Sequence, residues 1–220
     1  MSKATLLSAQ TAEQLLGELH PLAEQLGSAE GLASLTAIIA QVPQVENLAS
    51  LRQFLQKYKA TILFPIEVPA IHQAFFHIDR YEVKELIVWE RGLADQILSK
   101  ELAAASRRVG RNQLRRLRHL RDQRLVQRYI QAVEKGEAYG WHTVVYALVL
   151  HLFSLPLRQG LASYAHQTLR GFVESASRAL ELTQQEQHAV LYDASSDVNQ
   201  SIEAFLSKCG GPSPQIVQKR

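Results

Sequence analysis

The sequence predicts an all-α protein, folded as a single-domain helical bundle with a flexible C-terminal tail. Apolar residues recur at the three- and four-residue spacing of a helix through most of the 220 residues. The alternating apolar and polar pattern of half-exposed strands is absent, and so are the Asn-Gly and Asp-Gly pairs that close hairpins. A composition of 46% hydrophobic and 20% charged residues is that of an ordinary globular domain.

The first part of the chain is predicted to form short helices separated by prolines. One helix ends near His20, a second spans about residues 28–41, and a third spans about residues 47–59. Proline removes a backbone donor and disfavours helix in the residue before it. The joints are therefore expected at Pro43, Pro65 and Pro69.

From Glu82 onward the predicted helices are longer. The first has one apolar stripe, and its charged residues, Glu90 among them, lie mostly outside that stripe. The segment from Trp141 to Phe153 is the most apolar of the chain and is shorter than the roughly 20 residues that span a bilayer, so it is predicted to be a buried core helix.

The clearest predicted helix follows Ser154. Pro156 stands where a first-turn proline is favoured. The inward-facing stripe then continues for roughly seven turns. Its members are Leu157, Leu161, Tyr164, Ala165, Leu169, Phe172, Val173, Ala176 and Leu180.

Residues 1–208 are predicted to be one domain, because no repeat, low-complexity tract or linker interrupts them. Residues 209–220 are predicted to be a flexible tail, because their glycines and prolines end the helix and they have little apolar surface. The one cysteine, Cys209, forms no disulfide within the chain, which favours a reducing compartment. Residues 1–10 lack the pattern of a secretory signal, so a cytoplasmic location is expected.

The motifs of several enzyme classes are missing. The sequence has no Gly-Lys-Ser/Thr phosphate-binding loop, no His-Glu-x-x-His zinc site and no Gly-x-Ser-x-Gly nucleophile turn. The histidine pairs are five residues (His72, His77) or nine residues (His142, His151) apart, not the three or four that place two metal ligands on one helix face. We therefore expect no catalytic residue, no resident cofactor and no metal site, and a protein that is not an enzyme. A histidine acting as acid or base is the weaker alternative.

Nine arginines fall between residues 107 and 128. On a helix, Arg108, Arg111, Arg115 and Arg118 form one basic stripe, with apolar residues such as Leu114 on the other side. Three interpretations remain open: a solvated face, a docking face for an acidic protein, and a contact with RNA or DNA. The net charge of only +3 and the lack of interleaved aromatic residues make nucleic acid the least favoured partner.

The stretch from Lys100 to Leu191 resembles the UreF family of urease accessory proteins, through landmarks that occur in the family's order. The segment from Glu101 to Leu114, with its Ser106 and Gly110, is similar to the family's acidic-x-x-x-x-Ser-x-x-Met-Gly-x-x-Leu motif. The other landmarks are His142 to Val145, the long segment from Leu155 to Arg178, and Leu182 to Gln187. Before residue 100 the likeness is lower: Ala33 stands where the family has Glu after Gly-Leu, and Ala29 stands where it usually has Ser.

The resemblance implies a non-enzymatic chaperone subunit of nickel insertion. Such a protein docks a scaffold of the UreD type (also called UreH) and a GTPase of the UreG type, which together serve the urease apoenzyme. A homodimer is left open, and no membrane association is expected. The helix around residues 198–206 and the tail that follows are expected to dock on the scaffold, and the arginine-rich segment on the GTPase. The residues expected to contact partners are Ser106, Arg107, Gly110, Arg111, Arg115, His142, Tyr164, Arg178 and Gln187.

Overall fold

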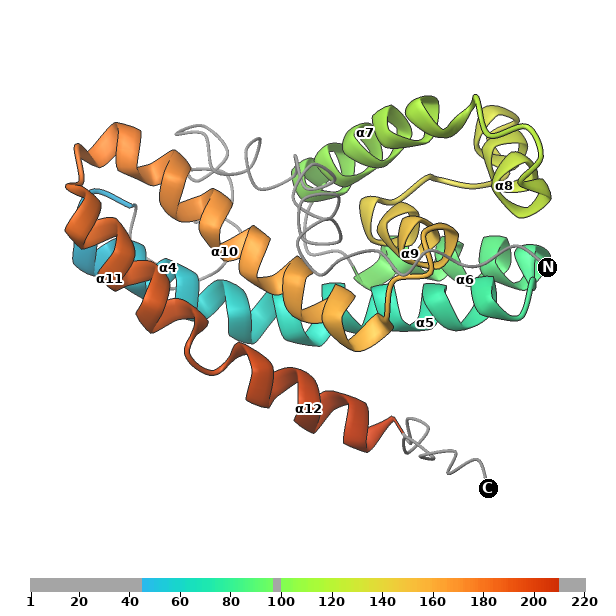
Figure 1. The fold of residues 1–220 in the computed structure, drawn as a ribbon. Helices are drawn as coiled ribbons and strands as arrows, with labels where there is room; N and C mark the ends of the chain where they lie inside the picture. The colour runs from blue at the N-terminus through green and yellow to red at the C-terminus, as the bar shows by residue number, and fades with distance from the viewer. Residues whose placement is uncertain (1–44, 97–99, 210–220) are drawn as a thin grey trace, which may run out of the picture.

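The computed structural model describes residues 45–96 and 100–209, which form helices and turns without any strand (Figure 1). This confirms the predicted all-α fold. The predicted helices before residue 45, the joint at Pro43 and the tail after Cys209 lie outside the described residues. The helices in chain order are α4 (Leu48–Tyr58), η1 (Lys59–Glu67), α5 (Val68–Asp79), α6 (Val83–Gln96), α7 (Lys100–Leu117), α8 (Arg124–Glu134), α9 (His142–Leu152), α10 (Leu157–Leu180), α11 (Gln184–Ser195) and α12 (Val198–Lys208).

The elements α4, η1 and α5 follow one another as a continuous helical column. Asn47 and Ser50 close a capping box at its start, which satisfies backbone donors that have no partner in the first turn. The prediction of joints at Pro65 and Pro69 is wrong. Pro65 lies inside the π-helical turns of η1, whose wider winding leaves more room for the proline ring against the preceding turn, and Pro69 lies in the first turn of α5. The junction residues keep helical backbone angles, so the chain does not bend away at either proline.

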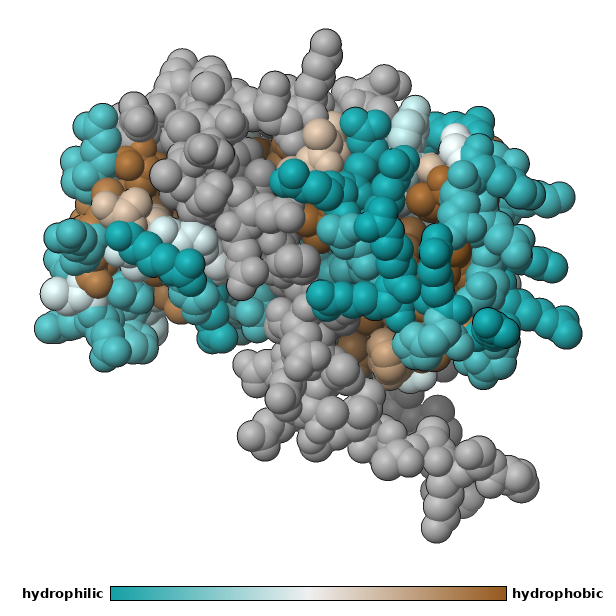
Figure 2. Space-filling model, turned by 90° about the horizontal axis from the view of Figure 1, so that it is seen from above, coloured by the Kyte–Doolittle hydropathy of each residue, from teal (hydrophilic) through white to brown (hydrophobic). Residues whose placement is uncertain are grey.

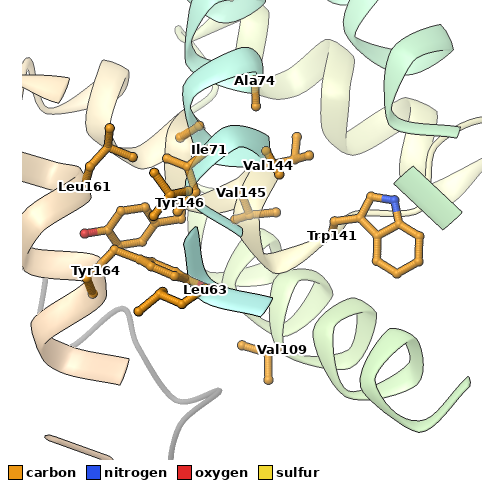
Figure 3. Packing of buried hydrophobic residues seen from close by; sticks show 14 of the residues in the cluster. Leu63, Ile71, Ala74, Val109, Trp141, Val144, Val145, Tyr146, Leu161 and Tyr164 are labelled. Atoms are coloured by element: carbon orange, nitrogen blue, oxygen red, sulfur yellow. The ribbon is translucent and has the colours of Figure 1, made fainter. Parts of the chain in front are cut away.

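Helix α9 is the buried helix that the sequence predicts. Every residue from His142 to Leu150 is buried. The helix packs against α5 and α7, and its Tyr146 ring meets the Tyr164 ring of α10 edge-on, with 5.0 Å between centroids (Figure 3). Burying one such aliphatic side chain contributes about 1.5–3 kcal/mol, so α9 supplies much of the hydrophobic stabilisation of this region.

Helix α10 buries one face along its length, as predicted. The buried stripe includes Leu161, Tyr164, Leu169 and Phe172, and the predicted end members, Leu157 and Leu180, are only partly buried. Pro156 is the N-cap residue and thus precedes the first turn in which it was expected. The Phe172 ring packs edge-on against the rings of Phe54 (5.1 Å between centroids) and Tyr58 (4.7 Å), which attaches α10 to the column.

A buried lysine joins the column to the last two helices. The Lys59 Nζ atom donates hydrogen bonds to the Ala194 carbonyl oxygen (2.8 Å) and to Asp197 Oδ1 (2.5 Å). Ala194 belongs to the end of α11, and Asp197 is the N-cap of α12. Beyond this bend α12 buries Val198 and Ile202, and the His72 ring of α5 meets the Phe205 ring edge-on at 5.3 Å.

Candidate functional site: an arginine face on α7 and α8

Eight arginines of α7, of the turns after it and of α8 are exposed, and we refer to this group as the arginine face. The sequence predicts that Arg118 continues the stripe of Arg108, Arg111 and Arg115 on a single helix. In the structure α7 ends at Leu117, so Arg118 lies one residue beyond the helix, although it lines one groove together with Arg111 and Arg115. Residues 118–123 fold into turns before α8 begins. The arginine face therefore spans two helices. Its members are Arg108, Arg111, Arg115, Arg116, Arg118, Arg121, Arg124 and Arg128.

Neighbouring oxygen atoms orient several of these arginines. Arg111 Nε donates to the Tyr139 carbonyl oxygen (3.1 Å), and Arg115 Nη1 donates to Asn112 Oδ1 (3.0 Å). Arg118 forms an ion pair with Glu134 of α8. Because Arg111 and Arg115 are held by neutral acceptors, their positive charge remains available to a partner.

Between α7 and α8 the arginine face contains a groove of about 240 Å³. Leu114, Ile130 and Val133 supply its apolar lining, and Arg111, Arg115, Arg118 and Glu134 supply the charged lining. Figure 2 shows the same arrangement on the right of the view, with apolar surface between hydrophilic side chains. Such a groove offers both apolar contact and positive charge to one ligand.

Gly110 sets the distance between α7 and the chain that leads into α9. A Cβ atom on Gly110 would lie 2.2 Å from the Gly140 carbonyl oxygen and 2.9 Å from the His142 nitrogen. Only glycine permits this approach of helix to backbone. Gly110 is buried in the described structure, where it allows α7 to pack directly on this backbone.

Ser106 and His142 form the next contact of the same interface. The backbone nitrogen of His142 donates to Ser106 Oγ (3.1 Å), and His142 Nδ1 lies 3.1 Å from Gln113 Oε1. Both Ser106 and His142 are buried. The half-buried Arg107 covers the interface from outside, with its guanidinium 5.4 Å from the centre of the Trp141 ring. Four of the predicted contact residues thus meet where α7 packs on the start of α9.

Glu90 of α6 is a buried carboxylate that the sequence interpretation places outside the apolar stripe, and this placement is wrong. Its carboxylate accepts hydrogen bonds from the Tyr129 hydroxyl (2.5 Å) and from the backbone nitrogen of Tyr139, and its carbonyl oxygen accepts one from Trp141 Nε1 (3.0 Å). Burial raises the pKa of Glu90, and the hydrogen bonds oppose that shift. Glu90 therefore ties α6, α8 and the segment before α9 together beneath the arginine face.

Tyr164 belongs to a second buried polar cluster, centred on Glu67. The Tyr58 hydroxyl donates to Glu67 Oε2 (2.9 Å), and Tyr164 also interacts with this carboxylate. Burial raises the pKa of Glu67 to about 7, although hydrogen bonds from the two tyrosines lower it in part. The Tyr164 ring lies 5.8 Å from that of His142, so this cluster adjoins the α7 interface.

Arg178 and Gln187 lie elsewhere, where α10 turns into α11. Gln187 Nε2 donates to the Leu182 carbonyl oxygen (2.9 Å), and a capping box of Thr183 and Glu186 starts α11. Arg178 is exposed in the last turn of α10. Figure 1 places this turn at the end of α10 that lies far from α8. The predicted contact residues therefore occupy two separate regions.

Within the ranges 45–96 and 100–209, no group of three or more His, Cys, Asp or Glu side chains is arranged to hold a metal ion. None of the helices in these ranges is both long and apolar enough to cross a membrane. The described residues thus form an all-α protein in which α7 and α8 carry exposed arginines over a buried core.

The sequence profile of the UreF family matches residues 45–195, and the chain belongs to this family. A urease accessory protein UreF from Lachnoclostridium phytofermentans is 25% identical over 115 residues, which are 52% of this chain and 50% of that protein. A urease accessory protein UreF from Ureaplasma urealyticum serovar 10 is 24% identical over 135 residues, which are 61% of this chain and 57% of that protein. The chain thus matches about half the length of these relatives.

Proposed function

We propose that this protein is a non-enzymatic, cytoplasmic chaperone subunit of urease maturation. In this function it docks a UreD-type (UreH-type) scaffold and a UreG-type GTPase, and the assembly inserts nickel, its cargo, into the urease apoenzyme. The observation that carries the proposal is the arginine face, presented by two helices of a UreF-family fold. We further propose that residues 1–208 form one domain, since buried residues from Leu51 to Ile202 belong to a single hydrophobic cluster.

The arginine face is the proposed docking surface for the GTPase. A guanidinium forms paired hydrogen bonds with a carboxylate, so a partner with an acidic surface fits this face. Ser106, Gly110 and His142 support this surface from within, because they fix the seat of α7. Arg107 and Tyr164 lie at the edge of the same interface and in the adjoining polar cluster.

Helix α12 and the residues after it are the proposed docking element for the scaffold. Val198 and Ile202 are the fully buried residues of α12, while Glu203, Ala204 and Lys208 are exposed. A helix held on one side presents its other side to a partner. Arg178 and Gln187 lie at the start of the same C-terminal region and are proposed to extend this surface.

Co-purification of the full chain with its cognate scaffold and GTPase tests the proposal. The double variant Arg111→Glu and Arg115→Glu should lose the GTPase and keep the scaffold, with a larger loss at low salt than at high salt. Lys84→Glu, an exposed charge reversal on α6, is the matched control and should retain both partners. Removal of residues 210–220 should weaken the scaffold complex without changing the melting temperature. Full retention of the GTPase by the double variant at both salt concentrations would exclude the arginine face from docking.

Nucleic acid is the alternative partner, and the density of arginines on α7 and α8 is the observation that favours it. Binding through phosphate contacts weakens steeply as salt rises. A gel shift with RNA and duplex DNA at two salt concentrations therefore checks this alternative. A salt-sensitive shift that the double variant abolishes, together with failure to bind the GTPase, would replace the proposed function with this one.

A further inference from the structure

A second hollow lies on the outer seam between α10 and α11, away from the arginine face. Its volume is about 450 Å³. The two helices are packed side by side and are joined by a short turn (Figure 1). The residues that line the hollow are Ser163, His166, Gln167, Arg170, His188, Leu191, Tyr192 and Ser195.

The spacing of these residues shows that the hollow is a regular groove. On α10 they are residues 163, 166, 167 and 170, and on α11 they are residues 188, 191, 192 and 195. Each set follows the i, i+3, i+4, i+7 pattern of a single helix face. The two faces border the groove for about 10 Å, since a helix rises 1.5 Å per residue.

The lining chemistry favours an anion. Seven of the eight lining side chains carry a group able to donate a hydrogen bond, and none of the eight is acidic. The guanidinium of Arg170 is exposed and makes no ion pair within the described part of the chain. The ring of His188 is oriented by a contact of 2.9 Å between its Nδ1 atom and the Gln184 carbonyl oxygen.

A neighbouring groove of the described structure has a different composition. The hollow between the column and the α11–α12 bend is of similar size, about 540 Å³. Asp193 and Asp197 are among its lining residues, and Lys59 is already bonded to Asp197. An anion would meet two carboxylates there and none in the α10–α11 groove.

Tyr192 adds an aromatic face to the groove. It is 78% exposed, although it is a large side chain. An exposed ring beside cationic groups offers a stacking surface to a nucleobase, and such stacking is tolerant of the base. Arg170 on one helix and Tyr192 on the other thus provide the two kinds of contact that a nucleotide requires.

We propose that the groove between α10 and α11 binds a nucleoside phosphate. Arg170, with His166 and His188, holds the phosphate group, and Tyr192 stacks on the base. A phosphate has more acceptor oxygens than a carboxylate and so makes fuller use of the hydroxyl, amide, imidazole and guanidinium donors that line the groove. The volume of about 450 Å³ falls in the usual range for small-ligand sites. This proposal does not depend on the proposed function.

Isothermal titration calorimetry of the full chain with AMP, inorganic phosphate and adenosine tests the proposal. We expect AMP to bind with a dissociation constant of about 1 mM or lower, inorganic phosphate to bind more weakly, and adenosine to bind weakest. Arg170→Ala should weaken AMP binding about tenfold or more, because it removes a charge-assisted hydrogen bond. Tyr192→Ala should weaken AMP binding while leaving phosphate binding unchanged.

Arg158→Ala is the matched control. Arg158 lies on the same helix and pairs with Glu203 outside the groove, so its removal should leave AMP binding unchanged. Melting curves establish that each variant is folded. No saturable AMP binding up to about 10 mM, or equal binding by wild type and Arg170→Ala, would overturn the phosphate site. Equal affinity for AMP and phosphate would overturn the assignment of the base to Tyr192.

Discussion

The substitution Gly110→Ala tests the close packing of α7, which carries part of the arginine face, against the backbone of residues 140–142. The added methyl carbon would lie 2.2 Å from the Gly140 carbonyl oxygen and 2.9 Å from both the His142 nitrogen and the Trp141 carbonyl carbon. All three are backbone atoms, so no side chain can rotate away to make room. Helix α7 must therefore move outward by about 1 Å or distort.

The size of the effect follows from two opposing terms. Alanine is the better helix former by about 0.5–1 kcal/mol, which favours the variant. Overpacking against rigid backbone costs about 1–3 kcal/mol and occasionally more. We expect a net loss of about 1–2 kcal/mol in the free energy of unfolding, because the steric term is the larger.

Urea unfolding followed by circular dichroism measures this loss, with Gly92→Ala as the matched control. Gly92 is a helical glycine of α6, and a Cβ atom there would have no neighbour within 4 Å. Gly92→Ala should therefore raise the free energy of unfolding by about 0.5–1 kcal/mol. A lower free energy of unfolding for Gly110→Ala together with a higher one for Gly92→Ala would support the packing argument. If Gly110→Ala is as stable as Gly92→Ala, the described approach of α7 to the α9 entry is wrong.

Three further predictions concern the buried polar clusters and a helix cap. The pKa of Glu67 is about 7 in the folded chain against an ordinary 4.5, so the folded state binds this proton more tightly and stability falls as pH rises between those values. Between pH 4.5 and 7.5 this group should lower the free energy of unfolding by on the order of 2–3 kcal/mol, and urea titrations should show that Glu67→Gln removes this decrease. Tyr129→Phe should cost about 1–3 kcal/mol at pH 7, because the buried Glu90 carboxylate loses a donor. Thr183→Ala should cost about 1 kcal/mol and speed amide exchange at the start of α11.

Each of these has an outcome that contradicts it. An unchanged pH profile for Glu67→Gln would show that the carboxylate is not desolvated in the folded chain. If Tyr129→Phe is as stable as the wild type, the hydrogen bond between Tyr129 and Glu90 does not stabilise the packing of α6 against α8. Unchanged exchange in α11 after Thr183→Ala would show that its first turn is held by other contacts.

The helices with long apolar stripes could be predicted from the sequence because their signal is local. The buried run of α9 and the stripe of α10 are set by residues three and four apart, so spacing alone locates them. The arginine face could be anticipated for the same reason, since its members are close in sequence. The division of these arginines between two helices could not be predicted, because the turns after Leu117 contain neither glycine nor proline, the residues that usually mark the end of a helix.

The remaining features depend on contacts between residues distant in sequence. Glu90 is buried because Tyr129 and the Tyr139 amide reach it from another part of the chain, and the periodicity of α6 contains no sign of this. Pro65 is tolerated because the chain adopts π-helical turns around it, whereas the sequence rule for proline assumes an α-helix. Gly110 was identified through a family motif, and only the structure shows which backbone atoms it admits.

The Lys59 ammonium group holds both sides of the bend between α11 and α12. Its Nζ atom donates hydrogen bonds to the Ala194 carbonyl oxygen near the end of α11 and to the Asp197 carboxylate at the start of α12. Both sides of the bend are therefore bonded to the same atom. A force applied along α12 would therefore act on this charged hydrogen bond as well as on the packing of Val198, Ile202 and Phe205. Tension applied by any molecule that grips α12 would therefore be delivered to the π-helical segment that begins at Lys59 and ends at the buried Glu67.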